Sequence, residues 1–127
     1  MYKIVVGVDG SEGAAAAIAW CREMAPRLAA DVIVVHALRP DAEVPSLEQV
    51  DAWCAPFRDE DLPIRRVIED EDPAMLLQRV ACEEQADLVV IGATRRGELA
   101  GLLLGSVVEG LAYHARRPVL IVPADDS

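Results

Sequence analysis

The chain has 127 residues, a formal net charge of −10 and a hydrophobic fraction of 53%. This length supports one core and is too small for two, so we expect a single domain over residues 1–127. The acidic balance argues against nucleic acid and anionic membranes as partners, because phosphate groups require basic patches. No apolar run is long enough to span a bilayer, and the first residues lack the features of a signal peptide. We therefore expect a cytoplasmic protein.

The three cysteines, Cys21, Cys54 and Cys82, are widely spaced and form no CxxC pair. This pattern fits a reducing compartment and offers no zinc site. Cys21 and Cys82 fall in segments of helical composition, where we expect small buried thiols.

The N-terminal third predicts a strand, a helix and a second strand. An apolar run over 3–8 is followed by Ser11, which can cap a helix over 14–28. Pro26 stands late in that helix and is expected to end or kink it near Met24. Residues 31–37 are β-branched without alternation, as in a strand that is buried on both faces.

The signals for secondary structure are weaker over residues 39–63, where prolines interrupt the chain. A short helix over 46–53 is expected before Pro56. Residues 64–68 alternate more between apolar and polar side chains than residues 31–37 do, which predicts a third strand near an edge of the sheet.

The second half of the chain repeats the alternation of helices and strands. Asp72 and Pro73 form an N-cap and first-turn pair that opens a helix to about Gln85. The elements expected after it are a strand over 86–91, a glycine-rich loop, a helix over 106–115 and a strand over 118–122.

This alternation predicts an α/β fold with a five-stranded, doubly wound parallel sheet and helices on both faces. Right-handed crossovers lead to the strand order 3-2-1-4-5, which changes direction between strands 1 and 4. Ligands of such sheets bind at the carboxyl ends of the strands beside that point. Those ends carry residues 8–11 and 92–97, so we expect both segments to line one crevice.

The second of these segments has the chemistry of an anion site. The loop that it opens, over residues 92–106, follows a buried strand, contains several glycines, and runs into Ser106 and Glu109, which have the spacing of a capping box. Glycines let the backbone approach a ligand closely, and the first amides of a helix carry a partial positive charge. A phosphate group is the usual occupant of such a position.

The same loop resembles the nucleotide loop of the universal stress protein family: glycine, two residues, glycine, nine residues, glycine, then serine or threonine. Gly92 and the pair Gly105-Ser106 match this pattern, whereas Arg95 stands at the second glycine position. The resemblance covers nearly the whole chain. Further matches are found over residues 4–12, 72–74 and 116–123.

The resemblance implies an adenine-nucleotide site. In nucleotide-binding members the position of Asp9 lies near ribose and adenine, that of Ala37 lines the adenine pocket, and the loop glycines hold phosphates. The nucleotide-binding residues that it implies here are Val8, Asp9, Gly10, Ala37, Gly92, Arg95, Arg96, Gly97, Gly105, Ser106 and Val107.

Structural interpretations stand beside these functional ones. Asp9 begins an Asp-Gly-Ser sequence typical of an Asx turn, and Ser106 is good capping chemistry in any protein. His36 has no accompanying nucleophile or carboxylate pattern, so we expect a packed side chain at a strand end rather than a base. Arg95 either obstructs the pocket or binds phosphate through its planar guanidinium, as Arg96 can beside it.

The last strand is hydrophobic and is expected at an edge of the sheet, which needs covering. In the family that the chain resembles, the last strands of two subunits pair antiparallel in a homodimer. The interface residues implied here are Val119, Leu120, Ile121 and Val122.

Other classes fit less well. A response-regulator receiver needs an acidic pair after strand 1 and a lysine after strand 5, but Lys3 is the one lysine of the chain. A flavodoxin-like carrier needs aromatic residues at the strand ends. ATP hydrolysis needs a positioned base, for which Asp9 is the one obvious candidate. We therefore favour a nucleotide-responsive binding module that takes ATP, with or without Mg²⁺. The alternative is a structural or interaction dimer whose crevice Arg95 blocks or alters.

Overall fold

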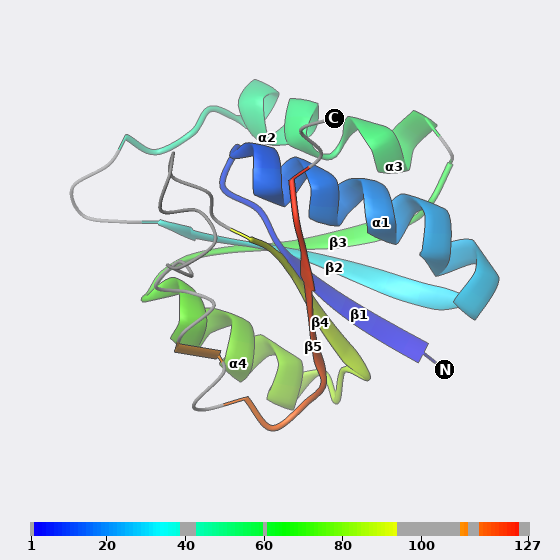
Figure 1. The fold of residues 1–127 in the computed structure, drawn as a ribbon. Coiled ribbons are helices and arrows are strands. Elements are labelled where there is room, and N and C mark those ends of the chain that lie inside the picture. The colour runs from blue at the N-terminus through cyan, green and yellow to red at the C-terminus, as the bar shows by residue number, and fades with distance from the viewer. Residues whose placement is uncertain (1, 39–42, 60, 94–109, 112–114, 125–127) are drawn as a thin grey trace.

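The computed structural model describes residues 2–38, 43–59, 61–93, 110–111 and 115–124. Five strands form a single sheet in the order β3-β2-β1-β4-β5, and every neighbouring pair is parallel (Figure 1). The strands are β1 (Tyr2–Gly7), β2 (Ala30–Leu38), β3 (Ile64–Asp70), β4 (Leu88–Gly92) and β5 (Val119–Val122). The expected fold class and the expected strand order are confirmed.

Helices cover both faces of this sheet. The helices with both ends in the described residues are α1 (Glu12–Leu28), α2 (Leu47–Trp53), α3 (Ala55–Asp59) and α4 (Pro73–Glu83). The first three lie on one face and α4 lies on the other (Figure 1). Within the described ranges, none of the helices has the length and apolarity that crossing a bilayer requires.

The two faces bury separate apolar clusters, as the period of two along a strand requires. Ile4 and Val6 point toward α1, where they pack with Ile18 and with Phe57 of α3. Val5 points the other way and packs in the cluster that contains Leu76 and Val80 of α4. Because β1 is covered on both faces, its central residues 4–6 are all apolar rather than alternating.

The helix caps follow the sequence closely. The Ser11 side chain accepts a hydrogen bond from the Ala14 amide at 3.1 Å, and Asp72 accepts from the Met75 amide at 3.2 Å. Pro26 does not end α1, which continues to Leu28. Leu28 packs on the core and holds the last turn, because tertiary packing outweighs the proline's local preference.

Helix α3 was not expected, since Pro56 lies inside it; its Phe57 is fully buried. Cys82 is exposed, whereas Cys21 and Cys54 are buried, so the expectation for Cys82 was wrong. The helix expected over 106–115 lies mostly outside the described residues.

Candidate functional site

The carboxyl ends of β1 and β4 lie side by side, as the predicted crevice requires. Val6 is in register with Val90, so the loop after β1 and the residues after β4 leave the same edge of the sheet. The amide of Val8 donates to the carbonyl of Val35 at 2.9 Å, which holds the start of the loop beside β2. The loop over residues 8–11 is thus positioned at the switch in strand order.

Asp9 forms the expected Asx turn. Its Oδ1 accepts a hydrogen bond from the Ser11 amide at 2.9 Å, and the Asp9 side chain is exposed. The next residue, Gly10, has a φ of +83°, a conformation that glycine adopts without strain. The turn presents a carboxylate at the carboxyl edge of the sheet, so the structural interpretation of Asp9 and the functional one are compatible.

Two residues support this loop from the α1 face of the sheet. The His36 Nδ1 lies 2.8 Å from the Val8 carbonyl oxygen, which can only accept, so Nδ1 donates. The His36 ring lies 5.1 Å from that of Trp53, measured between centroids. His36 is therefore a packed side chain at a strand end, in agreement with its structural interpretation.

Gly92 has a packing role. A Cβ built on it would lie 2.0 Å from the carbonyl carbon of Gly13, and a Cβ on Gly13 would lie 2.4 Å from the Ala93 oxygen. The first turn of α1 thus touches the carboxyl end of β4 backbone to backbone. This contact requires glycine at both positions and keeps side chains out of the space between them.

Ala37 occupies the penultimate position of β2 and packs with the apolar cluster on the α4 face. It pairs in register with Glu69 of β3. With Gly10, Gly92 and Ala93, it makes the carboxyl edge of β1, β2 and β4 a row of small residues.

The carboxyl end of β3 is acidic. The Arg79 guanidinium lies 2.7 Å from Glu69, 2.9 Å from Glu71 and 3.2 Å from Glu83. These carboxylates, with hydrogen bonds to Glu71 foremost, raise the pKa of Arg79 above its ordinary value. Since one cation faces three carboxylates, this corner keeps an excess of negative charge, which disfavours a nearby phosphate unless other cations balance it.

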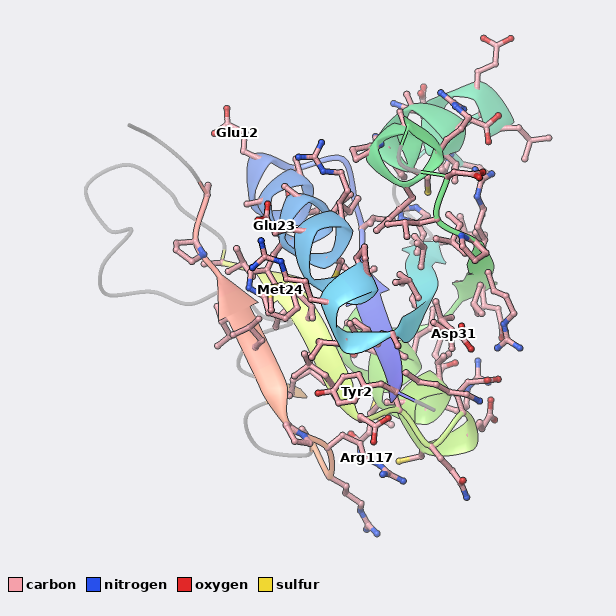
Figure 2. All side chains as sticks on the ribbon, turned by 90° about the vertical axis from the view of Figure 1, so that its right-hand side faces the viewer. Tyr2, Glu12, Glu23, Met24, Asp31 and Arg117 are labelled. Carbon is pink, nitrogen blue, oxygen red and sulfur yellow. The ribbon has the colours of Figure 1, made fainter. Side chains whose placement is uncertain are left out.

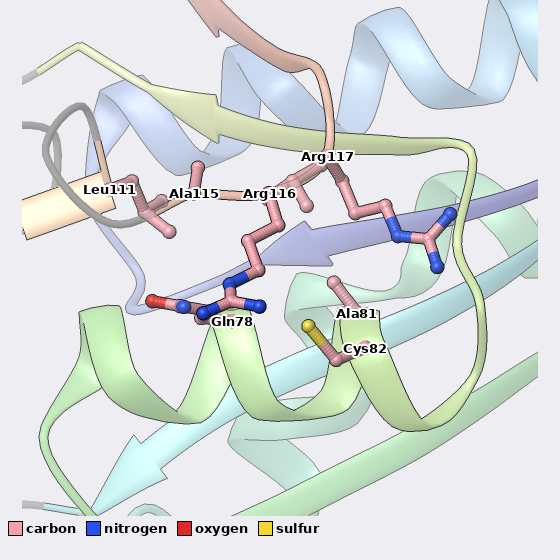
Figure 3. A pocket seen from close by; sticks show the side chains of 8 residues that line it. Gln78, Ala81, Cys82, Leu111, Ala115, Arg116 and Arg117 are labelled. Carbon is pink, nitrogen blue, oxygen red and sulfur yellow. The ribbon is translucent and has the colours of Figure 1, made fainter.

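A shallow hollow lies elsewhere, between α4 and the residues that lead into β5 (Figure 3). It is lined by Gln78 and Cys82 of α4 and by Arg116 and Arg117, among others. These residues lie toward the amino ends of β4 and β5, at the opposite end of the strands from the predicted crevice. The hollow is therefore separate from the candidate site.

The structure brings together Val8, Asp9, Gly10, Ala37 and Gly92 of the predicted nucleotide residues. The others, Arg95, Arg96, Gly97, Gly105, Ser106 and Val107, lie outside the described residues. Their roles stay predictions. Sequence reasoning missed Gly13 and Trp53, and nothing in their local sequence indicated a contact with the loops.

A comparison with known families decides the relationship. The model of the universal stress protein family matches residues 1–123. The chain belongs to this family. The universal stress proteins Rv2005c and Rv2623 of Mycobacterium tuberculosis are 33% and 34% identical to it over 93% of its length. The chain spans 44% of the length of each of these relatives.

Solved structures agree with this family assignment. A universal stress protein crystallised in complex with cAMP superimposes with a TM-score of 0.80 at 29% identity. The match covers 98% of each chain. The sheet order described above is thus that of a universal stress protein domain.

Proposed function

We propose that this universal stress protein domain binds an adenine nucleotide, with ATP as the expected ligand, in the crevice between the loops that follow β1 and β4. The observation that carries the proposal is the structural relative bound to cAMP, which aligns with this chain over 98% of both lengths. The glycine loop of the sequence adds a phosphate-binding motif at the corresponding strand end.

The residues at the carboxyl edge fit such a ligand. Asp9 offers an exposed carboxylate, and carboxylates accept hydrogen bonds from ribose hydroxyls. Arg95 and Arg96 would supply positive charge for the phosphates.

The proposed role is binding rather than catalysis: nucleotide occupancy would bias conformation or the choice of partner. We also propose that two copies pair through β5. That strand has β4 as its one neighbour among the described strands and lies at a margin of the sheet (Figure 2). Its Ile121 is 39% exposed, which supports an apolar contact there. A cytoplasmic location stays a prediction.

Calorimetry with ATP and Mg²⁺ tests the nucleotide proposal, using the wild type, Arg95→Gly and Gly105→Asp. We expect binding by the wild type and its loss in Gly105→Asp, because a carboxylate would replace a phosphate-contacting glycine. If the wild type is silent and Arg95→Gly binds, the second candidate holds: the chain is an interaction dimer whose crevice Arg95 has closed. If neither the wild type nor Arg95→Gly binds ATP, the proposed site is refuted.

A further inference from the structure

Trp53, the last residue of α2, packs against the β1–α1 loop. A Cβ built on Gly10 would lie 2.9 Å from the Trp53 Cζ2 and 3.0 Å from its Nε1. The indole therefore covers the backbone of the residue that directly follows Asp9. Unlike Phe57, which is fully buried, Trp53 is half-buried, so its position is not explained by filling the core alone.

His36 holds the residue on the other side of Asp9. Its Nδ1 donates to the Val8 carbonyl oxygen at 2.8 Å, and its ring lies against Trp53 with an interplanar angle of 55°. Asp9 thus stands between two backbone positions, each fixed by an aromatic side chain from a different element. Trp53 and His36 contact each other as well, so the two supports form one unit.

Helix α2 has few other attachments to the domain. Val50 is its one fully buried residue, and Asp51 forms an ion pair with Arg66 of β3 at 2.6 Å. Because Trp53 lies against Gly10 and His36, a displacement of the loop would change the surroundings of the indole at the end of α2.

We propose that Trp53 and His36 are positioning residues that hold the Asp9 loop in the conformation that receives the nucleotide, and that Trp53 registers whether the site is filled. This inference rests on the proposed function. Neither side chain needs to touch the ligand, because both act through the backbone on either side of Asp9.

The binding test compares Trp53→Ala and Trp53→Phe with a matched control, Trp20→Ala. Trp20 is also half-buried, and it packs on the same core cluster from α1. We expect Trp53→Ala to weaken ATP binding roughly tenfold in calorimetry, whereas Trp53→Phe and Trp20→Ala change it less than about threefold. In an Asp9→Ala background the effect of Trp53→Ala should fall below about twofold, because coupled residues are not additive. A purely structural role would instead lower the unfolding midpoint of both alanine variants and leave this coupling at zero.

His36 is tested by the same titration. His36→Phe keeps a ring against Trp53 but removes the donor to Val8, and we expect it to weaken ATP binding by roughly three- to tenfold. His36→Asn keeps a short side chain with a donor and should recover part of the loss. Equal affinity in His36→Phe and the wild type would remove His36 from the proposal.

Fluorescence provides a test in which Trp53 stays in place. The chain has two tryptophans, so Trp20→Phe leaves Trp53 as the single emitter. We expect its emission to change and saturate with ATP at the dissociation constant that calorimetry gives, and this change to disappear with Asp9→Ala. If Trp53→Ala binds ATP with the affinity of the wild type, or if ATP binds without changing the Trp53 emission, this inference is overturned and the proposed function is not. Absence of ATP binding by the wild type would overturn the proposed function with it.

Discussion

The contact between Gly92 and Gly13 leads to a sharp prediction about stability. In Gly92→Ala the new methyl would lie 2.0 Å from the Gly13 carbonyl carbon, 2.1 Å from its oxygen and 2.6 Å from the Ala14 nitrogen. Carbon atoms in contact stand about 3.5–4.0 Å apart, so the first turn of α1 would have to move by about 1.5 Å. All three atoms belong to the backbone, so no side-chain rotation can relieve the clash.

Overpacking a core costs about 1–3 kcal/mol where side chains can adjust. Since they cannot adjust here, we expect Gly92→Ala to lower the free energy of unfolding by about 3 kcal/mol or more, a large part of the 5–15 kcal/mol typical of a domain. Gly92 does not have a positive φ, so backbone strain adds nothing to this figure. Urea denaturation followed by circular dichroism measures the difference.

Gly7→Ala is the matched control, since Gly7 ends the neighbouring strand β1. Its Cβ would lie 3.3 Å and 3.4 Å from the two Leu77 methyls, so this side chain has to shift by only a few tenths of an ångström. The loss of glycine's freedom in the unfolded chain offsets part of the cost, so the net change should stay within about 1 kcal/mol. Equal urea midpoints for the two variants would refute the close backbone contact. Because Gly92→Ala is expected to harm packing by itself, Gly105 is the better position for testing phosphate binding.

Three further predictions concern acid stability, thiol chemistry and assembly. The Arg65 guanidinium lies 2.7 Å from Glu84 and holds the pKa of that carboxyl below its ordinary value of 4.5. The stabilisation from the ionised Glu84 is therefore present above pH 4.5 and is lost as the pH falls through the lowered pKa. Glu84→Gln should therefore lose less free energy of unfolding than the wild type in denaturation series between pH about 6 and about 3; parallel pH curves would contradict this. An aromatic disulfide reagent at pH 8 should modify the exposed Cys82 in the folded protein and all three thiols after unfolding. Cys21 should be protected in the folded protein because burial raises its pKa to about 12, and fast labelling of Cys21 before unfolding would contradict its burial. Ile121→Lys should convert the proposed dimer to monomer in sedimentation velocity, because it places a charge on the β5 edge, and an unchanged sedimentation coefficient would remove that edge from the interface.

The sequence alone determined the architecture. Apolar runs without alternation indicate strands that are covered on both faces, and the caps at Ser11 and Asp72 locate two helix starts. Right-handed crossovers then leave the observed strand order, which places the loops after β1 and β4 at the same edge. These inferences succeed because periodicity and capping depend on residues that are close in the sequence, and because the handedness of crossovers is the same in nearly all such sheets.

The tertiary structure decided what the individual site residues do. Gly92 matches a nucleotide motif, yet its backbone contact with Gly13 requires glycine whether or not a ligand binds. Trp53 lies 43 positions after Gly10 and supports it. The contacts of Gly92 with Gly13 and of Gly10 with Trp53 depend on how α1 and α2 pack on the sheet. Neither the composition nor the hydrophobic periodicity of the sequence predicts them. The same reason explains Pro26, which the packing of Leu28 keeps inside its helix.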